Sequence, residues 1–187
     1  MTMQAEYLLF PTALGRCALA WRLDGTGTPR VTGFQLPEST EAQTEGRIAR
    51  AAGAMHGEAP PASIQALVAQ VQRHLSGEPQ DFQQVPLDLD GVAGFARQVY
   101  AVAQAIPAGE TLTYGEVAAQ LGQPGAARAV GQALGRNPIA LIIPCHRVLA
   151  AGGKPGGFSA HGGASTKEKL LAIEGAVRGG GQLELGV

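Results

Sequence analysis

Residues 113–136 have the sequence TYGEVAAQLGQPGAARAVGQALGR, and this stretch decides the fold of the C-terminal half. Thr113 followed by Glu116 matches the capping box that begins many helices, because each side chain can bond to the backbone N–H of the other residue. The run GQPG at residues 122–125 predicts a tight turn, and a second helix follows until Asn137-Pro138 ends it. Two short helices around a four-residue turn are typical of a helix-turn-helix, although any pair of antiparallel helices gives the same pattern.

The second of these helices, about residues 126–136, has an unusual surface. Val130 and Leu134 mark its buried side, and Arg128 lies about 200° around the helix axis from Val130, so it points to solvent. The remaining surface is mostly alanine and glycine. Small residues beside one projecting arginine suit close approach to the narrow minor groove of DNA, with the arginine inserted into the duplex. Tight packing against the rest of the domain explains the same composition, and the pattern alone does not choose between the two.

The reactive residues follow directly downstream. Residues 139–143 are a continuous apolar run, which predicts a short, fully buried strand, and Pro144 places Cys145 at the end of that strand. A buried structural cysteine is the common alternative. Here, however, the neighbours include His146 and Arg147, a composition that favours a lowered thiol pKa and therefore a nucleophilic thiolate.

The side chain next to the cysteine is a histidine. Adjacent side chains of an extended chain point to opposite faces, so His146 would not touch the sulfur of Cys145 unless the backbone turns sharply or a water molecule connects them. We favour a proton relay through water. A third member is expected from the last helix, where Ser165 and Glu168 form a second capping box and Glu174 occupies the last turn. A carboxylate there opposes the helix dipole, so a buried partner is expected, and His146 is the candidate; a surface glutamate at a frayed helix end is the alternative.

The N-terminal half predicts a small α/β unit. Strands are expected at residues 7–10, 16–22 and 31–36, joined as an antiparallel meander. Ser63 is expected to cap a helix that stops at Gly77.

The chain between the halves is polar and extended at residues 83–91, which indicates a linker, and a helix with apolar positions from Phe95 to Ile106 follows it. We therefore predict an α/β domain over residues 1–90 and a mostly helical domain over residues 91–187. The glycine-rich tail from Arg178 is expected to be disordered.

Composition limits the class of protein. The 187 residues are 45% hydrophobic, enough for one or two compact cores, and no apolar run approaches the roughly 18 residues of a membrane span. The N-terminus has no targeting pattern, so we expect a cytoplasmic protein without a membrane partner. Two cysteines, Cys17 and Cys145, are too few for a disulfide framework and fit a reducing compartment. Because Cys17, His56 and His74 lack ligand spacing, no metal site is predicted.

The charge is distributed unevenly. The net charge of −1 argues against binding of nucleic acid by bulk electrostatics, but residues 123–154 contain four basic residues and no acidic one. A surface of that kind can contact a few phosphates with salt-sensitive affinity. An ordinary solvated surface has the same composition.

These residues together resemble the O6-alkylguanine-DNA alkyltransferases, also called methylated-DNA–protein-cysteine methyltransferases. The resemblance rests on RAVG at residues 128–131, Asn137-Pro138, PCHRV at residues 144–148 and a Leu-Leu-x-x-Glu helix ending at Glu174. It covers about residues 95–176, and the PCHRV run is its most specific part. The resemblance implies a ribonuclease-H-like fold for the N-terminal domain and a helix-turn-helix in the C-terminal one.

The same resemblance implies a single-turnover DNA repair reaction. Cys145 would accept an alkyl group from O6 of guanine, or from O4 of thymine, and keep it as a thioether, without a metal or organic cofactor. His146 would generate the thiolate through water, with Glu174 holding its tautomer. Tyr114 would protonate the leaving guanine or assist rotation of its nucleotide. The partner would be double-stranded DNA, bound through its minor groove by a monomer.

The resemblance also implies how the DNA and the flipped base are held. Arg128 would fill the space that the extruded nucleotide leaves in the stack, and Asn137 would brace the turn before the strand. The remaining contacts are expected from small or basic residues of the second helix (Ala127, Ala129, Gly131 and Arg136) and from a base pocket formed by Phe158, Ser159 and the main-chain carbonyls of Cys145 and Val148.

Three positions depart from the family pattern. Phe158 stands where tyrosine is frequent, Ala140 stands where some relatives have proline, and the loop 157–163 is longer than in familiar relatives, with no assigned role for His161. Two other classes compete with the repair protein. A DNA-binding relative without transfer activity would lack Cys145, and a cysteine hydrolase would turn over repeatedly.

Overall fold

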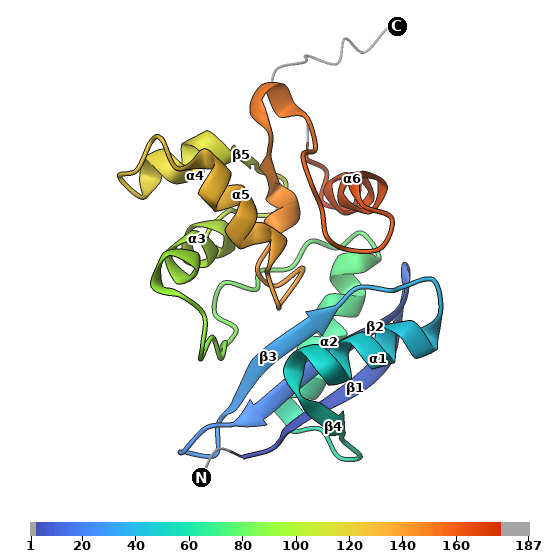
Figure 1. The fold of residues 1–187 in the computed structure, drawn as a ribbon. Helices are drawn as coiled ribbons and strands as arrows, with labels where there is room; N and C mark the ends of the chain where they lie inside the picture. Colours follow the sequence, from blue (N-terminus) through green and yellow to red (C-terminus); the bar gives the residue numbers. More distant parts are fainter. Residues whose placement is uncertain (1–2, 177–187) are drawn as a thin grey trace, which may run out of the picture.

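The structure, a computed structural model, describes residues 3–176 of the 187-residue chain. Its N-terminal half is a four-stranded sheet with one helix on each face, α1 in front and α2 behind in Figure 1. The strand order is β3-β2-β1-β4, with β4 parallel to β1 and the other pairs antiparallel. The predicted meander is therefore confirmed. The strands are β1 (Ala5–Thr12), β2 (Gly15–Leu23), β3 (Pro29–Gln35) and β4 (Ala54–His56).

The alternation in β2 separates the two faces of the sheet. Cys17, Leu19 and Trp21 belong to the larger core, which includes the apolar side of α2 (Ala62–Leu75). That helix ends close to Gly77, as expected, but Ser63 does not cap it. Pro61 occupies the N-cap position, and no side chain caps the helix, because proline has no side-chain oxygen that could accept from the first backbone N–H groups.

Helix α1 (Glu41–Ala52) on the other face was not predicted. Thr40 caps it, accepting from the N–H of Gln43 at 3.2 Å. Small side chains on the sheet let this helix approach closely: a Cβ on Gly33 would lie 3.0 Å from the Cδ1 atom of Ile48. The helix is short of apolar residues, so its periodicity in the sequence is weak.

The C-terminal half is mostly helical, and its helices surround a two-stranded parallel sheet, β5–β6. The capping box of α4 is present, with Thr113 and Glu116 bonded to each other's backbone N–H groups at 2.6 and 3.1 Å. The second predicted box is wrong, because Gly163 occupies the N-cap position of α6 and no side chain caps that helix. The elements are α3 (Gly94–Gln104), β5 (Leu112–Thr113), α4 (Tyr114–Gln120), α5 (Ala127–Gly135), two 3-10 helices (Cys145–Arg147 and Ala151–Gly153), β6 (Val148–Leu149) and α6 (Ala164–Ile173).

The apolar run 139–143 is not the predicted strand. All of it except the partly buried Ala140 is buried, but it forms successive turns, with a single bridge from Ile139 to Phe34 of β3. Leu141 has a φ of 69°, a left-handed conformation that β structure excludes. A continuous apolar run indicates that the segment is buried, but it does not specify a strand. A buried segment can form turns when its backbone N–H and C=O groups have hydrogen-bond partners outside a sheet.

Asn137 supplies two of those partners, and backbone bonds within the turn supply others. Its Oδ1 atom accepts from the N–H of Ile139 at 2.9 Å, and its Nδ2 atom donates to the carbonyl of Ile143 at 2.8 Å. One side chain therefore bonds to the turn at both ends. These hydrogen bonds replace those that a strand would form with a neighbouring strand. Cys145 follows this turn directly.

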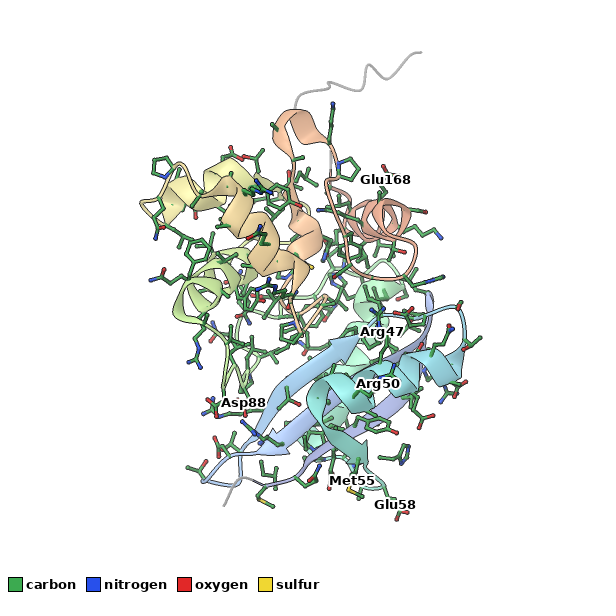
Figure 2. All side chains as sticks on the ribbon, viewed as in Figure 1. Arg47, Arg50, Met55, Glu58, Asp88 and Glu168 are labelled. Carbon is green, nitrogen blue, oxygen red and sulfur yellow. The ribbon has the colours of Figure 1, made fainter. Side chains whose placement is uncertain are left out.

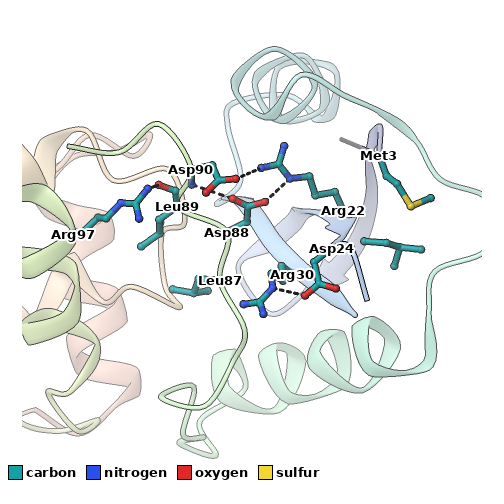
Figure 3. A pocket seen from close by; sticks show the side chains of 11 residues that line it. Met3, Arg22, Asp24, Arg30, Leu87, Asp88, Leu89, Asp90 and Arg97 are labelled. Atoms are coloured by element: carbon teal, nitrogen blue, oxygen red, sulfur yellow. Dashed lines mark hydrogen bonds and ion pairs between the residues drawn. The ribbon is translucent and has the colours of Figure 1, made fainter. Parts of the chain in front are cut away.

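The linker between the halves is bound to the edge of the sheet. The N–H of Val31 donates to the carbonyl of Pro86 at 2.9 Å, and the N–H of Asp88 donates to the carbonyl of Val31 at 2.8 Å. Figure 3 shows Arg22 of β2 pointing at Asp88 and Asp90, with which it forms ion pairs. The division into domains at residues 90 and 91 stays a prediction, since one hydrophobic core contains residues of both halves.

Within residues 3–176, no helix is both long and apolar enough to cross a membrane. The prediction for the tail from Arg178 falls outside the described residues.

Candidate active site

Cys145 is the first residue of a 3-10 helix and is buried. Burial raises the pKa of its thiol, since a thiolate is poorly solvated inside the protein; a hydrogen bond from Asn137 and the charge of Lys167 act in the opposite direction without outweighing it. The prediction of a lowered thiol pKa is therefore wrong for the free protein. A thiolate at this position requires a base.

His146 is placed to be that base. The 3-10 helix is the sharp backbone turn that was one of the two expected possibilities. The ring is fully buried, and its Nε2 atom lies 2.8 Å from Oε1 of Glu174, so the two groups pair as predicted. Burial is the main cause that lowers the pKa of His146 below 6.5, which keeps the imidazole neutral near pH 7.

The proton of His146 can be assigned from its partner. A carboxylate only accepts, so the Nε2 atom carries the proton and Nδ1 is left with a lone pair. Among residues 3–176, Nδ1 has no hydrogen-bond partner, although it is buried. The side chain adjacent to Cys145 thus holds an unused proton acceptor.

Glu174 is held by more than the expected single partner. Arg147 donates from Nη2 to Oε1 at 2.8 Å and from Nε to Oε2 at 3.0 Å, and the Nε2 atom of His74 lies 2.9 Å from Oε1. Burial opposes the charge of Glu174, but the hydrogen bonds from His146, His74 and Arg147 outweigh it and lower the carboxyl pKa. The carboxylate is charged and fixed in position.

Lys167 is a site residue that the sequence analysis missed. It is fully buried on α6, and its Nζ atom donates to the carbonyl of Val148 at 2.6 Å. It also lies 5.7 Å from the ring centre of Tyr114 and 6.0 Å from that of Phe158. Burial lowers the pKa of Lys167 to about 8, although Cys145 raises it.

A signal for this lysine was present in the sequence. Lys167 stands three and four residues before Leu170 and Leu171, which places it on the buried stripe of the helix. The carbonyl of Val148, which was expected to bind guanine, already accepts from this lysine, and that of Cys145 accepts from the N–H of Val148. Each oxygen retains one further lone pair.

A cavity of about 580 Å³ opens onto Cys145. One wall comes from the turn that contains Asn137 and Ala140, and another comes from the loop at Phe158 and Ser159. The lining also includes three arginines: Arg136, which follows α5, and Arg47 and Arg50, both labelled on α1 in Figure 2. The two arginines from the N-terminal half had no role in the sequence analysis.

A second hollow of about 530 Å³ connects this loop to the surface of α5. Arg128 lines this hollow and is exposed, as the helical pattern predicted; Ala129 is also exposed, and Val130 and Leu134 are buried. Its lining brings Ala127 and Gly131, two of the predicted DNA-contact residues, together with Tyr114, Phe158 and Ser159, whereas Arg136 lines the cavity at Cys145.

Tyr114 begins α4 beside the reactive cysteine. Burial and, to a smaller degree, Cys145 raise the pKa of its hydroxyl, so the group remains protonated. A Cβ built on Gly156 would lie 2.8 Å from the Tyr114 hydroxyl oxygen, so the 150s loop fits closely against it. His161, which had no assigned role, has its Nδ1 atom 3.8 Å from Oε2 of Glu38.

The described part of the chain contains no cluster of three or more His, Cys, Asp or Glu residues that could hold a metal ion. The groups around Cys145 are instead a base, an anchored carboxylate and a cation. This set can form a thiolate, and the adjoining cavity can admit a substrate.

Comparison with known proteins identifies the family. The model of the 6-O-methylguanine DNA methyltransferase DNA-binding domain matches residues 94–176. The crystal structure of Mycobacterium tuberculosis O6-methylguanine methyltransferase superposes with a TM-score of 0.71 and 36% identity, covering 97% of this chain and 99% of that one. The chain belongs to the methylated-DNA–protein-cysteine methyltransferase family.

A further relative and a second structure support this assignment. One from Mycolicibacterium paratuberculosis is 48% identical over 114 residues, which are 61% of this chain and 67% of the relative. The Mycobacterium tuberculosis protein in complex with DNA has a TM-score of 0.68 and 35% identity, with 91% of this chain and 92% of that chain covered. The mixed α/β fold of the methyltransferase is thus shared over both halves.

Proposed function

We propose that this chain repairs DNA by moving an alkyl group from O6 of guanine to the sulfur of Cys145 in one irreversible turnover. Family membership supports the reaction, and the unpaired Nδ1 atom of the buried His146 supports the assignment to this cysteine. O4 of thymine, an alkylated oxygen on a smaller ring, is a second substrate of the same site.

The reaction begins with proton removal. A water molecule takes the proton of the Cys145 thiol and passes one to Nδ1 of His146, whose positive charge Glu174 then stabilises. Lys167 adds a positive charge that favours the thiolate. Because burial opposes the thiolate, it forms in the presence of substrate rather than persisting in the free protein.

Transfer then follows as an in-line displacement. The sulfur forms a bond to the alkyl carbon while the bond between that carbon and O6 breaks, and the electron pair passes to the guanine. The guanine takes a proton from Tyr114, which is protonated at neutral pH. Since the sulfur attacks the alkyl carbon directly and the guanine leaves, the step uses no organic cofactor or metal.

The substrate base must leave the duplex to reach a buried sulfur. We propose that α4 and α5 form a helix-turn-helix whose second helix enters the minor groove, where Ala127, Ala129 and Gly131 permit close approach. Arg128 fills the gap left by the flipped nucleotide. Arg136 binds phosphate nearby.

The flipped guanine fits the cavity beside Cys145. Phe158 provides an apolar wall and Ser159 a polar group near O6, and the carbonyls of Cys145 and Val148 accept from the amino group. Asn137 positions the sulfur by closing the preceding turn. The N-terminal half is proposed to be ribonuclease-H-like, and the protein is proposed to act as a monomer.

Mass spectrometry of the intact protein tests this function. After incubation with a duplex that contains O6-methylguanine, we expect one added methyl group per chain, located on Cys145, and no further repair by the spent protein. An unmodified cysteine with intact substrate would refute the proposal, and repeated turnover would favour a hydrolase. A duplex with O4-methylthymine tests the second substrate.

Two substitutions separate DNA binding from transfer. Cys145→Ala is expected to bind the duplex and transfer nothing. Arg128→Ala is expected to weaken both, whereas Gln132→Ala, at an exposed position on the same helix, is the matched control with a smaller effect. Equal effects of the two helix substitutions would contradict the role of Arg128.

A further inference from the structure

Glu174 is shared by two buried histidines from opposite halves of the chain. The Nε2 atom of His146 lies 2.8 Å from Oε1, and the Nε2 atom of His74, on α2, lies 2.9 Å from the same oxygen. Both rings are fully buried. The alkyl-transfer reaction as described above uses His146 and leaves the second histidine without a role.

The proton of His74 is fixed by the backbone. Its Nδ1 atom accepts from the N–H of Gln80 at 2.9 Å, and a backbone amide can only donate. The ring proton therefore lies on Nε2 and is donated to Glu174. The ring of Phe82, 5.2 Å away, packs against the imidazole and limits its rotation.

Three donors thus converge on one carboxylate oxygen. Oε1 of Glu174 accepts from His74, His146 and Nη2 of Arg147, whereas Oε2 accepts from Nε of Arg147. These are the charged and titratable groups around the carboxylate in the described structure. A second donor to Oε1 influences His146 directly. It bonds to the same oxygen that orients the His146 ring, and it shares the negative charge that this oxygen offers to His146.

We infer that His74 is a positioning residue for alkyl transfer, which holds Oε1 of Glu174 in place and moderates its attraction for the proton of His146. This inference rests on the proposed function of Cys145. A moderated carboxylate leaves His146 neutral and able to accept a proton at Nδ1. Loss of the donor would let Glu174 hold a protonated His146 more strongly, so the base would be occupied at a higher pH.

The test compares three substitutions of His74. His74→Gln can place its amide nitrogen near the position of Nε2 and keep the bond to Glu174. His74→Asn is shorter and can accept from Gln80, but it cannot reach the carboxylate. His74→Phe keeps the ring volume and loses both bonds.

Single-turnover rates on O6-methylguanine duplex are measured from pH 5 to 9 for each protein, together with duplex affinity and thermal unfolding. For the asparagine variant we expect a rate about tenfold lower near neutral pH, the effect of one hydrogen bond to a charged group, and a fall in rate that begins at a higher pH. The glutamine variant should resemble the unsubstituted protein. Affinity for the duplex should not change in any of them.

The possible outcomes distinguish a failure of the proposed function from a failure of the role of His74. If the unsubstituted protein transfers no methyl group, the proposed function fails. If it does transfer, unchanged rates in both the asparagine and phenylalanine variants overturn the role of His74. Equal losses of rate in the asparagine and glutamine variants, with an unshifted pH profile, also overturn it, because they indicate a structural effect alone. If the phenylalanine variant does not fold, the comparison of the asparagine and glutamine variants decides.

Discussion

Replacing Lys167 with methionine is expected to stabilise the folded protein while slowing alkyl transfer. The ammonium group is fully buried among Val148, Tyr114 and Phe158. Methionine has a similar length and no charge to bury, so it should occupy the same space. Transfer should slow severalfold, because Lys167 is one of the groups that favour the Cys145 thiolate.

The size of the stabilisation follows from the pKa of the lysine. Burial lowers that pKa from 10.5 to about 8, and at about 1.4 kcal/mol per pH unit this corresponds to roughly 3 kcal/mol of destabilisation while the group is charged. Loss of the hydrogen bond to Val148 offsets about 1 kcal/mol of the gain, which leaves about 2 kcal/mol at pH 7.

The pH dependence has a definite sign. Below pH 8 the lysine is charged in both the folded and the unfolded state, so the penalty is complete. Above pH 8 the folded protein releases the proton while the unfolded chain keeps it until about pH 10.5, so the penalty disappears as the pH rises. The advantage of Lys167→Met should therefore shrink by about 2 kcal/mol between pH 7 and pH 9.5.

Urea unfolding at the two pH values measures this difference. Both proteins carry Cys145→Ser so that titration of the thiol does not contribute. Lys169→Met, at an exposed position on the same helix, is the matched control and should show neither the gain nor its pH dependence. A methionine variant that is less stable at pH 7, or whose advantage is the same at both pH values, would refute the reasoning.

Three other predictions follow from the site. Gly156→Ala should slow transfer more than Gly152→Ala: both glycines have positive φ, but only at residue 156 does the new Cβ meet the Tyr114 hydroxyl, at 2.8 Å; equal single-turnover rates would contradict this. The transfer rate of the unsubstituted protein should hold at pH 6.5 and fall only at lower pH, because burial lowers the pKa of His146 and the neutral ring is the base; stopped reactions across pH 5 to 8 locate the fall. Asn137→Ala should cost about 2 kcal/mol in urea unfolding, since it leaves the buried N–H of Ile139 without its partner and the carbonyl of Ile143 with only the N–H of Cys145, and Asn137→Asp should not recover the loss, because a carboxylate oxygen would face that carbonyl.

Local rules of sequence were sufficient for much of the fold. The meander of three strands, the capping box at Thr113 and the orientation of Arg128 all depend on neighbours in the chain, and each is confirmed. The pairing of Glu174 with His146 was also expected, because a carboxylate in the last turn of a helix is unfavourable with respect to the helix dipole unless a buried partner stabilises it.

The remaining features depend on contacts between distant segments. The turn at residues 139–143 is stabilised by its own backbone bonds and by the side chain of Asn137, and the spacing of apolar residues gives no sign of either. His74 reaches Glu174 across 100 positions of the chain. The pKa of the Cys145 thiol was misjudged because its sequence neighbours suggest a polar site, whereas tertiary packing removes the water.

The outer edge of β3 has a further consequence for the behaviour of the protein in solution. Exposed edge strands recruit strands from other molecules and so promote aggregation. Here Val31 bonds to the segment at residues 86–88, and the N–H of Phe34 donates to the carbonyl of Pro138 at 3.0 Å. The turn beside the reactive cysteine therefore also shields the sheet from other chains, and an isolated N-terminal fragment ending at residue 90 would keep the cover at Val31 but expose the N–H of Phe34 to other strands.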